Sequence, residues 1–307
     1  MNQRTRIIVC SVLLASAVCL TAAAPMLAAC AEGSAPVAEN MELCTYRNVS
    51  VGGRLTAVDP EGDELTFTIT TQPVKGQVEL TQDGRFVYTP DVNRKGRDYF
   101  GFKATDAEGN ASQEATVIIR IAKQKTSVTY SDMSGSADAY AATELAEQGV
   151  FVGSRIGSLW VFEPDRQVSR GEFLSMCMVL FGKDVLSGVV STGFYDDNAI
   201  PAWEKAFVAT ALMDGAVSGY TTPQGSVFHA TAPIIRSEAA VLLDNLMELT
   251  EVSALRWDEA APAWAAQSDA NLTACGITAD GVAYDAALTR ADAAEMLISA
   301  LTVKAAR

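Results

Sequence analysis

The chain contains very little histidine and lacks the common catalytic motifs. Among its 307 residues there is one histidine, His229. A Ser-His-Asp or Cys-His catalytic site would depend on that residue, and no recognisable partner surrounds it in the sequence. No H-E-x-x-H, P-loop or G-x-S-x-G motif is present. We therefore expect a protein that is not an enzyme, although a carboxylate pair for glycoside cleavage stays open because acids are plentiful.

Basic tracts are also absent, and the net charge is −14. This charge disfavours non-specific binding to nucleic acid. The acidity is concentrated in the C-terminal part, where the chain from Tyr130 onwards has 10 Lys and Arg against 23 Asp and Glu. An anionic ligand of that part would have to be held by local arginines.

Cysteines are few, and no C-x-x-C motif occurs among the six of them. Cys44, Cys177 and Cys275 stand far apart, so we expect no disulfide framework. Cys177 and Cys275 are best interpreted as small buried apolar residues.

Residues 1–31 are predicted to be an export signal. Arg4 and Arg6 precede a long apolar run that ends in small residues. Two kinds of processing remain open: a cut before Glu32 after an A-x-A sequence, or lipidation of Cys30 in a lipobox-like sequence. No later segment reaches the ~18 apolar residues that a membrane span needs, so we expect an exported bacterial protein with no transmembrane segment in its mature form.

Residues 36–122 alternate between apolar and polar positions in short runs such as "ELTFTIT" and "GRFVYTP". This period of two, with many Val, Ile, Thr, Phe and Tyr residues, is typical of strands. Turn sequences such as "DPEGD" and "AEGN" separate the runs. About seven strands over this length predict an Ig-like β-sandwich. A polar linker, residues 123–129, follows it.

The segments "AVDPEGDELTFTI" and "FKATDAEGNASQEATVIIRI" make this domain resemble the bacterial cadherin-like Ig repeats. The resemblance implies a possible calcium cofactor, because hard cations take clustered carboxylate oxygens. The alternative is that the same acids only form turns. The implied calcium ligands are Asp59, Glu61, Asp63, Asp106 and Glu108.

The remainder of the chain is a threefold repeat with helical periodicity, at residues 130–183, 190–250 and 254–304. Each copy has an aromatic–acid start, a helix that ends at glycine, a loop, an Arg-x-acid motif and a second helix. Trp203 to Gly215 and Trp264 to Gly276 each span twelve residues. The third copy is degenerate because its loop is shorter.

The helix after each loop is predicted to start at a capping box. Ser169-x-x-Glu172 and Thr289-x-x-Asp292 fit this pattern, whereas the second copy has Ile235 in place of the hydroxyl residue. Capping explains the hydroxyl and the acid, but it does not explain the arginine that stands between them in each copy. A solvated arginine, or one paired with a neighbouring acid, is the alternative to a ligand-binding arginine.

The ordered motifs of the three copies resemble those of the S-layer homology family. They are "YSD", "GVFVG", "VFEP" and "SRGE" in the first copy, "FYD", "GAVSG" and "IRSE" in the second, and "PAW" and "TRAD" in the third. The resemblance implies an all-α prism with pseudo-threefold symmetry. It also implies that grooves between the copies bind a pyruvylated secondary cell-wall polysaccharide. The expected fold is thus multidomain, an all-β sandwich followed by this all-α region, and the expected function is non-covalent anchoring at the bacterial cell wall or surface.

The polysaccharide-binding residues that follow from this resemblance are of four kinds. Arginine forks would bind carboxylates, tryptophans would stack on sugars or belong to the core, glycines would let the backbone approach the sugar, and acids would come from the aromatic–acid starts. We expect the groove around Arg236 to be the best formed. The residues are Arg170, Arg236, Arg290, Trp203, Trp264, Gly153, Gly219, Asp132 and Asp196.

Three other functions stay open. The chain could be a structural S-layer component or a lipoprotein tethered through Cys30, and a cell-wall glycoside hydrolase is a further alternative. The protein partner of the Ig-like domain is not identified by its sequence.

Overall fold

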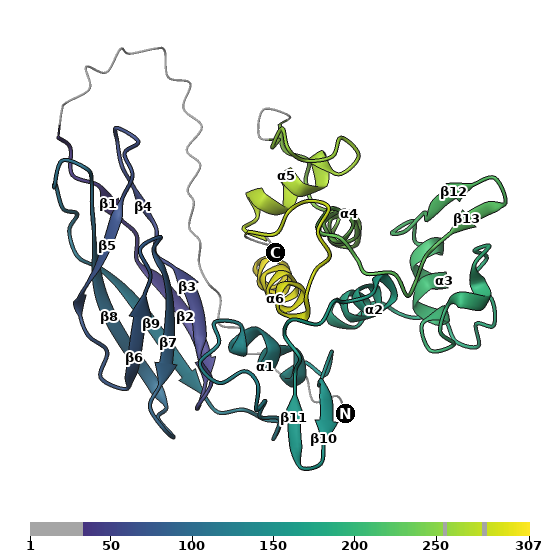
Figure 1. Ribbon diagram of the computed structural model, residues 1–307, viewed down its shortest axis with the longest axis horizontal. Helices are drawn as coiled ribbons and strands as arrows, with labels where there is room; N and C mark the ends of the chain where they lie inside the picture. Colours follow the sequence, from purple (N-terminus) through teal and green to yellow (C-terminus); the bar gives the residue numbers. More distant parts are fainter. Residues whose placement is uncertain (1–32, 254–256, 278–280) are drawn as a thin grey trace. The chain divides into compact units, whose positions relative to one another are not determined.

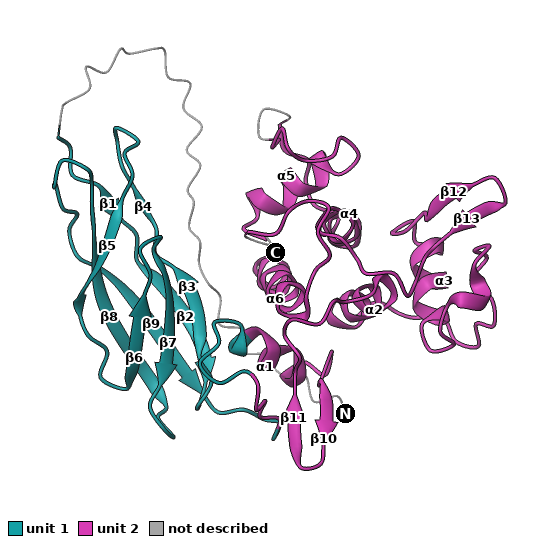
Figure 2. Ribbon diagram, in the orientation of Figure 1, with its two compact units in different colours: residues 1–127, 133–140 teal, residues 128–132, 141–307 magenta. Residues whose placement is uncertain are grey.

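The computed structural model describes residues 33–253, 257–277 and 281–307. The predicted export signal and Cys30 lie outside these residues. The chain divides into two compact units, which Figure 2 distinguishes by colour. The first unit runs to Ser127 and includes Met133–Tyr140, and the second comprises Val128–Asp132 and Ala141–Arg307. None of the helices in the described ranges combines the length and apolar character that a membrane span requires.

The first unit is a β-sandwich of two main sheets (Figure 1). One sheet has the strand order β2-β9-β8-β5, in which β2 is parallel to β9, and the other has the order β3-β7-β6. β1 and β4 form a separate short antiparallel pair. The strands are β1 (Val37–Ala38), β2 (Met41–Tyr46), β3 (Val51–Arg54), β4 (Ala57–Val58), β5 (Thr66–Thr71), β6 (Gly76–Leu80), β7 (Arg85–Pro90), β8 (Gly96–Thr105) and β9 (Ala115–Ala122).

The alternating sequence pattern explains which side chains form the core between these sheets. In β9 every second residue is buried, and Val117 and Ile119 are completely so. The buried hydroxyl of Tyr88 donates a hydrogen bond to Asp98 (2.8 Å), which also accepts from the backbone of Val74 and Lys75. Three donors compensate the buried carboxylate. The predicted β-sandwich of the N-terminal region is confirmed.

The second unit is helical, and its helices alternate with two short antiparallel hairpins (Figure 1). The hairpins correct the all-α expectation, because they occupy the loops of the first two repeats. Their three-residue strands are too short for periodicity to reveal. The elements are α1 (Ala139–Glu147), β10 (Ser154–Ile156), β11 (Leu159–Val161), α2 (Arg170–Leu180), η1 (Asp197–Ala199), α3 (Lys205–Met213), β12 (Tyr220–Thr222), β13 (Gly225–Val227), α4 (Arg236–Met247), α5 (Ala266–Ala274) and α6 (Arg290–Ala306).

The predicted capping boxes are confirmed at the starts of α2 and α6. The Ser169 hydroxyl accepts from the backbone N–H of Glu172, and the Glu172 carboxylate accepts from that of Ser169. Thr289 and Asp292 make the same two bonds. At α4 only the carboxylate half is possible, because Ile235 has no side-chain acceptor.

The segments before α2, α4 and α6 join the three repeats into a closed ring of backbone bridges. The first residue of each helix donates its N–H to the loop of the following repeat, and the third repeat returns to the first. Figure 1 shows α2, α4 and α6 gathered around one centre. These hydrogen bonds are Arg170 N to Ala232 O (2.9 Å), Arg236 N to Ala286 O (3.0 Å) and Arg290 N to Arg166 O (2.8 Å).

Candidate functional site

The three repeated arginines each extend across the ring to a backbone carbonyl of the following repeat. This shared contact explains why an arginine recurs at the head of each helix, which capping alone does not. Each carbonyl belongs to the loop just before the next Arg-x-acid motif. The hydrogen bonds are Arg170 Nε to Phe228 O (3.0 Å), Arg236 Nη1 to Val282 O (2.7 Å) and Arg290 Nη1 to Phe162 O (2.8 Å).

Each arginine also forms an ion pair and lies over an aromatic ring. Their side chains are 13%, 16% and 8% exposed in chain order, so these contacts are mostly shielded from water. Ion pairing, one of the two alternatives raised by the sequence, is therefore what the structure contains. The ion pairs are Arg170–Glu238 (2.9 Å), Arg236–Asp269 (3.0 Å) and Arg290–Glu163 (2.8 Å). The rings are Tyr220 and Phe228 below Arg170, Tyr284 below Arg236 and Phe151 below Arg290.

The three guanidinium groups differ in the N–H groups that they leave open. Within the described chain, the side-chain hydrogen bonds of Arg290 all use Nη1, so Nε and Nη2 are left for a two-pronged contact. Arg170 uses Nε and Nη1. Arg236, around which the sequence favoured the best groove, uses both Nη1 and Nη2, because Asp269 of α5 lies beside it.

The acids of the aromatic–acid starts fix the loops that the arginines contact. Both carboxylates accept from two consecutive backbone N–H groups, and the second residue of each loop has a left-handed φ of 58°. Such a backbone turn is strained for a residue other than glycine. Asp132 accepts from Phe162 and Glu163, and Asp196 accepts from Phe228 and His229, at 2.7–3.0 Å.

The two predicted backbone-approach glycines are required by the hairpins. Gly153 and Gly219 have φ values of +67° and +70°. A Cβ atom at Gly219 would lie 2.6 Å from the carbonyl oxygen of Val227 and would also overlap Phe194. At Gly153 it would overlap the carbonyl oxygen of Val161. These glycines therefore allow strand closure rather than offering an open surface.

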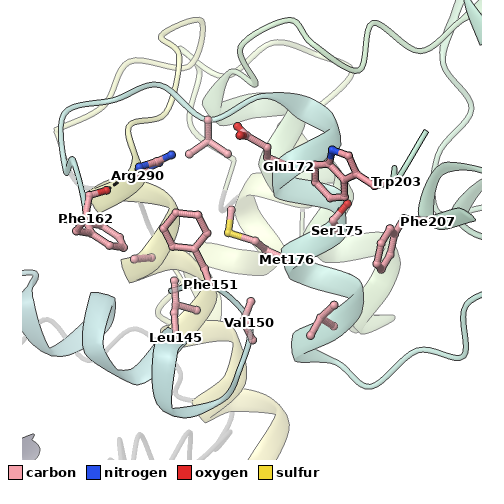
Figure 3. A pocket seen from close by; sticks show the side chains of 13 residues that line it. Leu145, Val150, Phe151, Phe162, Glu172, Ser175, Met176, Trp203, Phe207 and Arg290 are labelled. Carbon is pink, nitrogen blue, oxygen red and sulfur yellow. Dashed lines mark hydrogen bonds between the residues drawn. The ribbon is translucent and has the colours of Figure 1, made fainter. Parts of the chain in front are cut away.

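Two equivalent grooves lie between the repeats. Groove A, of about 320 Å³, is lined by Trp203, Arg290, Glu172, Phe151, Met176 and Phe207, among others. Figure 3 shows Trp203 and Phe207 at one side, Phe151 and Arg290 at the other, and Met176 and Glu172 between them. Groove B, of about 180 Å³, is lined by Trp264, Arg170, Glu238, Val217, Leu242 and Asn245, among others.

The correspondence between the grooves is positional. Residues 151, 172 and 176 of groove A correspond to 217, 238 and 242 of groove B, a separation of 66 residues in each case. Each groove thus combines two neighbouring repeats with an arginine from the remaining repeat. Arg236 lines neither groove.

The tryptophans of both grooves are exposed. Trp203 is 58% and Trp264 60% accessible to solvent. Of the two roles that the sequence left open, core packing is therefore ruled out for both. An exposed indole beside a guanidinium and a carboxylate suits a ligand with both an apolar face and polar edges.

Two of the predicted calcium ligands, Asp59 and Asp106, serve turns. One carboxylate oxygen of Asp59 accepts from the backbone of Glu61 and Asp63, both at 3.0 Å. Asp106 accepts from the backbone and side chain of Asn110. The charge of Asp63 raises the pKa of Glu108, so these two carboxylates lie close together. Among the described residues, no group of three or more His, Cys, Asp or Glu residues is placed to hold a metal ion.

Two features of the structure are not predicted by any pattern in the sequence. Cys44 is disulfide-bonded, although its spacing from the other cysteines predicted no disulfide framework. Sequence spacing could not reveal it, because pairing depends on the fold. The second feature is Glu204, which follows Trp203 and is buried. As predicted, Cys177 is a buried free thiol, and burial raises its pKa well above the ordinary value. Cys275 is also free, but it is only partly buried, which corrects the prediction for that residue.

Comparison with known proteins concerns the first unit. Residues 33–123 match the family model of the bacterial cadherin-like domain. No curated protein sequence matches the chain. The domain indicates an extracellular, adhesion-type or surface protein.

Several solved structures are similar to about a third of this chain. The endo-fucoidan hydrolase MfFcnA4 from glycoside hydrolase family 107 is 20% identical over 31% of this chain and 14% of its own, with a TM-score of 0.25. The SrpA adhesin of Streptococcus sanguinis is 17% identical over 32% and 68%, with a TM-score of 0.26. Drosophila N-cadherin EC1-4 is 15% identical over 29% and 24%, with a TM-score of 0.22. What the comparisons identify is thus a bacterial cadherin-like domain at residues 33–123.

Proposed function

We propose that the chain is a non-covalent cell-surface anchor. In this proposal the helical unit is an S-layer homology region whose grooves A and B bind an anionic, pyruvylated secondary cell-wall polysaccharide, and the cadherin-like domain is displayed outside the cell. The observation that carries the proposal is the recurrence of one arrangement in two grooves: an exposed tryptophan, an arginine and a carboxylate at equivalent positions. The motif resemblance supplies the class of ligand.

The chemistry of each groove suits an acidic sugar polymer. The indole of Trp203 or Trp264 offers a flat apolar surface for a sugar face. In groove A the open Nε and Nη2 edge of Arg290 can donate two parallel hydrogen bonds to a planar carboxylate. Glu172 has one carboxylate oxygen beyond its capping bond, which can accept from a sugar hydroxyl. Such local contacts are necessary because the overall charge of this unit opposes an anion.

Groove A is the stronger candidate for the carboxylate contact. Arg170 in groove B is held by Phe228, Tyr220 and Glu238, so a ligand there competes with existing bonds. Arg290 keeps its outer edge free of partners within the described residues. We therefore assign the acidic group of the polymer to groove A and neutral sugar stacking to groove B.

Cosedimentation with purified bacterial cell walls tests this function. Arg290→Lys should weaken wall binding about tenfold, because the charge remains while the two-pronged contact is lost. Trp203→Ala should weaken it similarly through loss of stacking. The matched control is Trp257→Ala, since Trp257 is 41% exposed and lines neither groove. Equal binding by all four proteins, at unchanged thermal stability, would contradict the assignment.

The alternative functions have their own readouts. Mass spectrometry of the mature N-terminus distinguishes a free Glu32 from an acylated Cys30. A tethered lipoprotein requires the acylated Cys30. Release of soluble sugar from purified walls would indicate a glycoside hydrolase. Ordered two-dimensional arrays formed by the purified protein would indicate a structural S-layer component.

A further inference from the structure

Glu204 occupies an unusual position at the start of α3, directly after Trp203 of groove A. The residue is 2% exposed. Its Oε2 atom is buried and has no hydrogen-bond partner in the part of the chain that the structure describes. A buried carboxylate without a partner is unfavourable in its charged form. The site therefore suits the neutral carboxylic acid.

The neighbouring helix is adapted to this side chain. Gly171, in the first turn of α2, leaves the space that the carboxyl group fills, and a Cβ atom there would overlap Oε2 of Glu204. The equivalent positions in groove B are Ser237 and, after Trp264, the completely buried Ala265. Glu204 and Gly171 are thus a matched pair that groove A has and groove B lacks.

The charged groups on the surrounding elements do not compensate Glu204. Burial and, second, the negative charge of Glu172 on α2 raise the pKa of Glu204 to about 7. The nearby cations are engaged with other groups. Lys205 pairs with Asp197 (2.6 Å), Arg170 with Glu238 (2.9 Å), and Arg166 lies at 3.5 Å from Glu163 and 4.0 Å from Glu172.

We propose that Glu204 is a positioning residue that makes ligand binding in groove A depend on pH. In its acid form it seats α3 against α2 and holds Trp203 at the groove. On losing its proton it moves towards water, and the start of α3 moves with it and displaces Trp203. Groove B, with Ala265 at this place, keeps its geometry over the same pH range.

This inference rests on the proposed function only for the identity of the ligand. It predicts that an acidic wall polymer is bound through both grooves in mildly acidic surroundings and through groove B alone in alkaline ones. A single buried acid is enough to make the two grooves differ. Loss of its proton shifts the equilibrium between the seated and the displaced position of Trp203, by as much as these two conformations differ in proton affinity.

Wall cosedimentation of the full chain at about pH 5.5 and about pH 8 tests the proposal. The Trp264→Ala variant lacks the tryptophan of groove B and therefore binds through groove A. It should bind walls about fivefold more weakly at the higher pH. The Trp203→Ala variant, which relies on groove B, should show no such change. Adding Glu204→Gln to Trp264→Ala should abolish the change, whereas adding Glu251→Gln, at an exposed acid, should preserve it. A pH effect that persists in the Glu204→Gln protein would overturn the proposal.

A measurement without ligand separates this proposal from the proposed function. In a ¹³C carboxyl NMR titration, the signal that is missing from the Glu204→Gln protein should titrate near neutral pH and shift together with the Trp203 indole signal. Titration of that carboxyl in the ordinary glutamate range would overturn the proposal even if walls are bound. Absence of wall binding at every pH, with the NMR result as expected, would overturn only the anchoring function.

Discussion

At the scale of single residues, the repeated arginines are first of all structural. Each joins two repeats through a hydrogen bond to a backbone carbonyl, an ion pair with an acid and a contact with the face of an aromatic side chain. Their recurrence was visible in the sequence, but their partners were not. Arg290 and Phe162 are 128 residues apart in the chain, and no local pattern predicts such a contact.

The Arg236 ion pair provides a stability prediction. Arg236→Ala should lower the free energy of unfolding by about 3 kcal/mol, because Asp269 would remain mostly buried without its partner. Urea unfolding, followed by circular dichroism, measures this change. Arg155→Ala, at an exposed arginine near the Trp160 ring, is the control and should cost less than about 1 kcal/mol. Equal losses in the two variants would show that the Arg236 pair is not special.

Glu204 provides a pH prediction for stability. Its pKa of about 7 in the folded protein lies above the ordinary glutamate value of 4.5, so the folded state holds the proton more tightly than the unfolded state. The free energy of unfolding should therefore be highest below pH 4.5, fall as the pH rises towards 7, and level off above it. The total decline should be roughly 3 kcal/mol. Glu204→Gln should remove this decline. Urea unfolding at several pH values measures it, and parallel pH curves for the two proteins would contradict the account.

At the scale of elements, local signals were the most informative part of the sequence. The hydroxyl and acid of the capping boxes predicted the starts of α2 and α6, and the period of two predicted the sandwich strands. The short hairpins β10–β11 and β12–β13 escaped prediction because three-residue strands carry no period. Their open ends depend instead on the close approach of Gly153 and Gly219 to the opposite strand and to an aromatic ring.

A cap removal tests the helix starts. Ser169→Ala should destabilise the protein by about 1 kcal/mol, because the backbone N–H of Glu172 loses its acceptor. Thr289→Ser keeps the acceptor at the equivalent place and should change stability by less than about 0.5 kcal/mol. Chemical denaturation of both variants provides the comparison. If both substitutions have the same effect, the capping interpretation fails.

Calcium binding by the sandwich loops stays a prediction, now centred on Asp63 and Glu108. Because these two carboxylates repel each other, a cation bound between them should relieve the repulsion. Calcium at about millimolar concentration should raise the melting temperature of the full chain. Glu108→Gln should abolish that rise. An unchanged melting temperature of the unmodified protein after calcium addition would argue for purely turn-forming acids.

At the scale of the whole molecule, two units with different compositions are joined in one chain. The first has the fold of a bacterial cadherin-like domain, and the second carries most of the negative charge. The sequence could predict the grooves only as a class, through the repeat motifs. It could not show that the arginine of each groove comes from the remaining repeat, outside the two repeats that form the groove walls. This arrangement arises only when the three repeats close into a ring.

The most direct test of the anchoring account is cosedimentation of the full chain with native cell walls and with walls stripped of secondary polymer. The account predicts that the protein pellets with native walls, stays in solution with stripped walls, and is released from native walls when Trp203 and Trp264 are both replaced by alanine. Equal pelleting with stripped walls, or undiminished pelleting of the folded double variant, would contradict it.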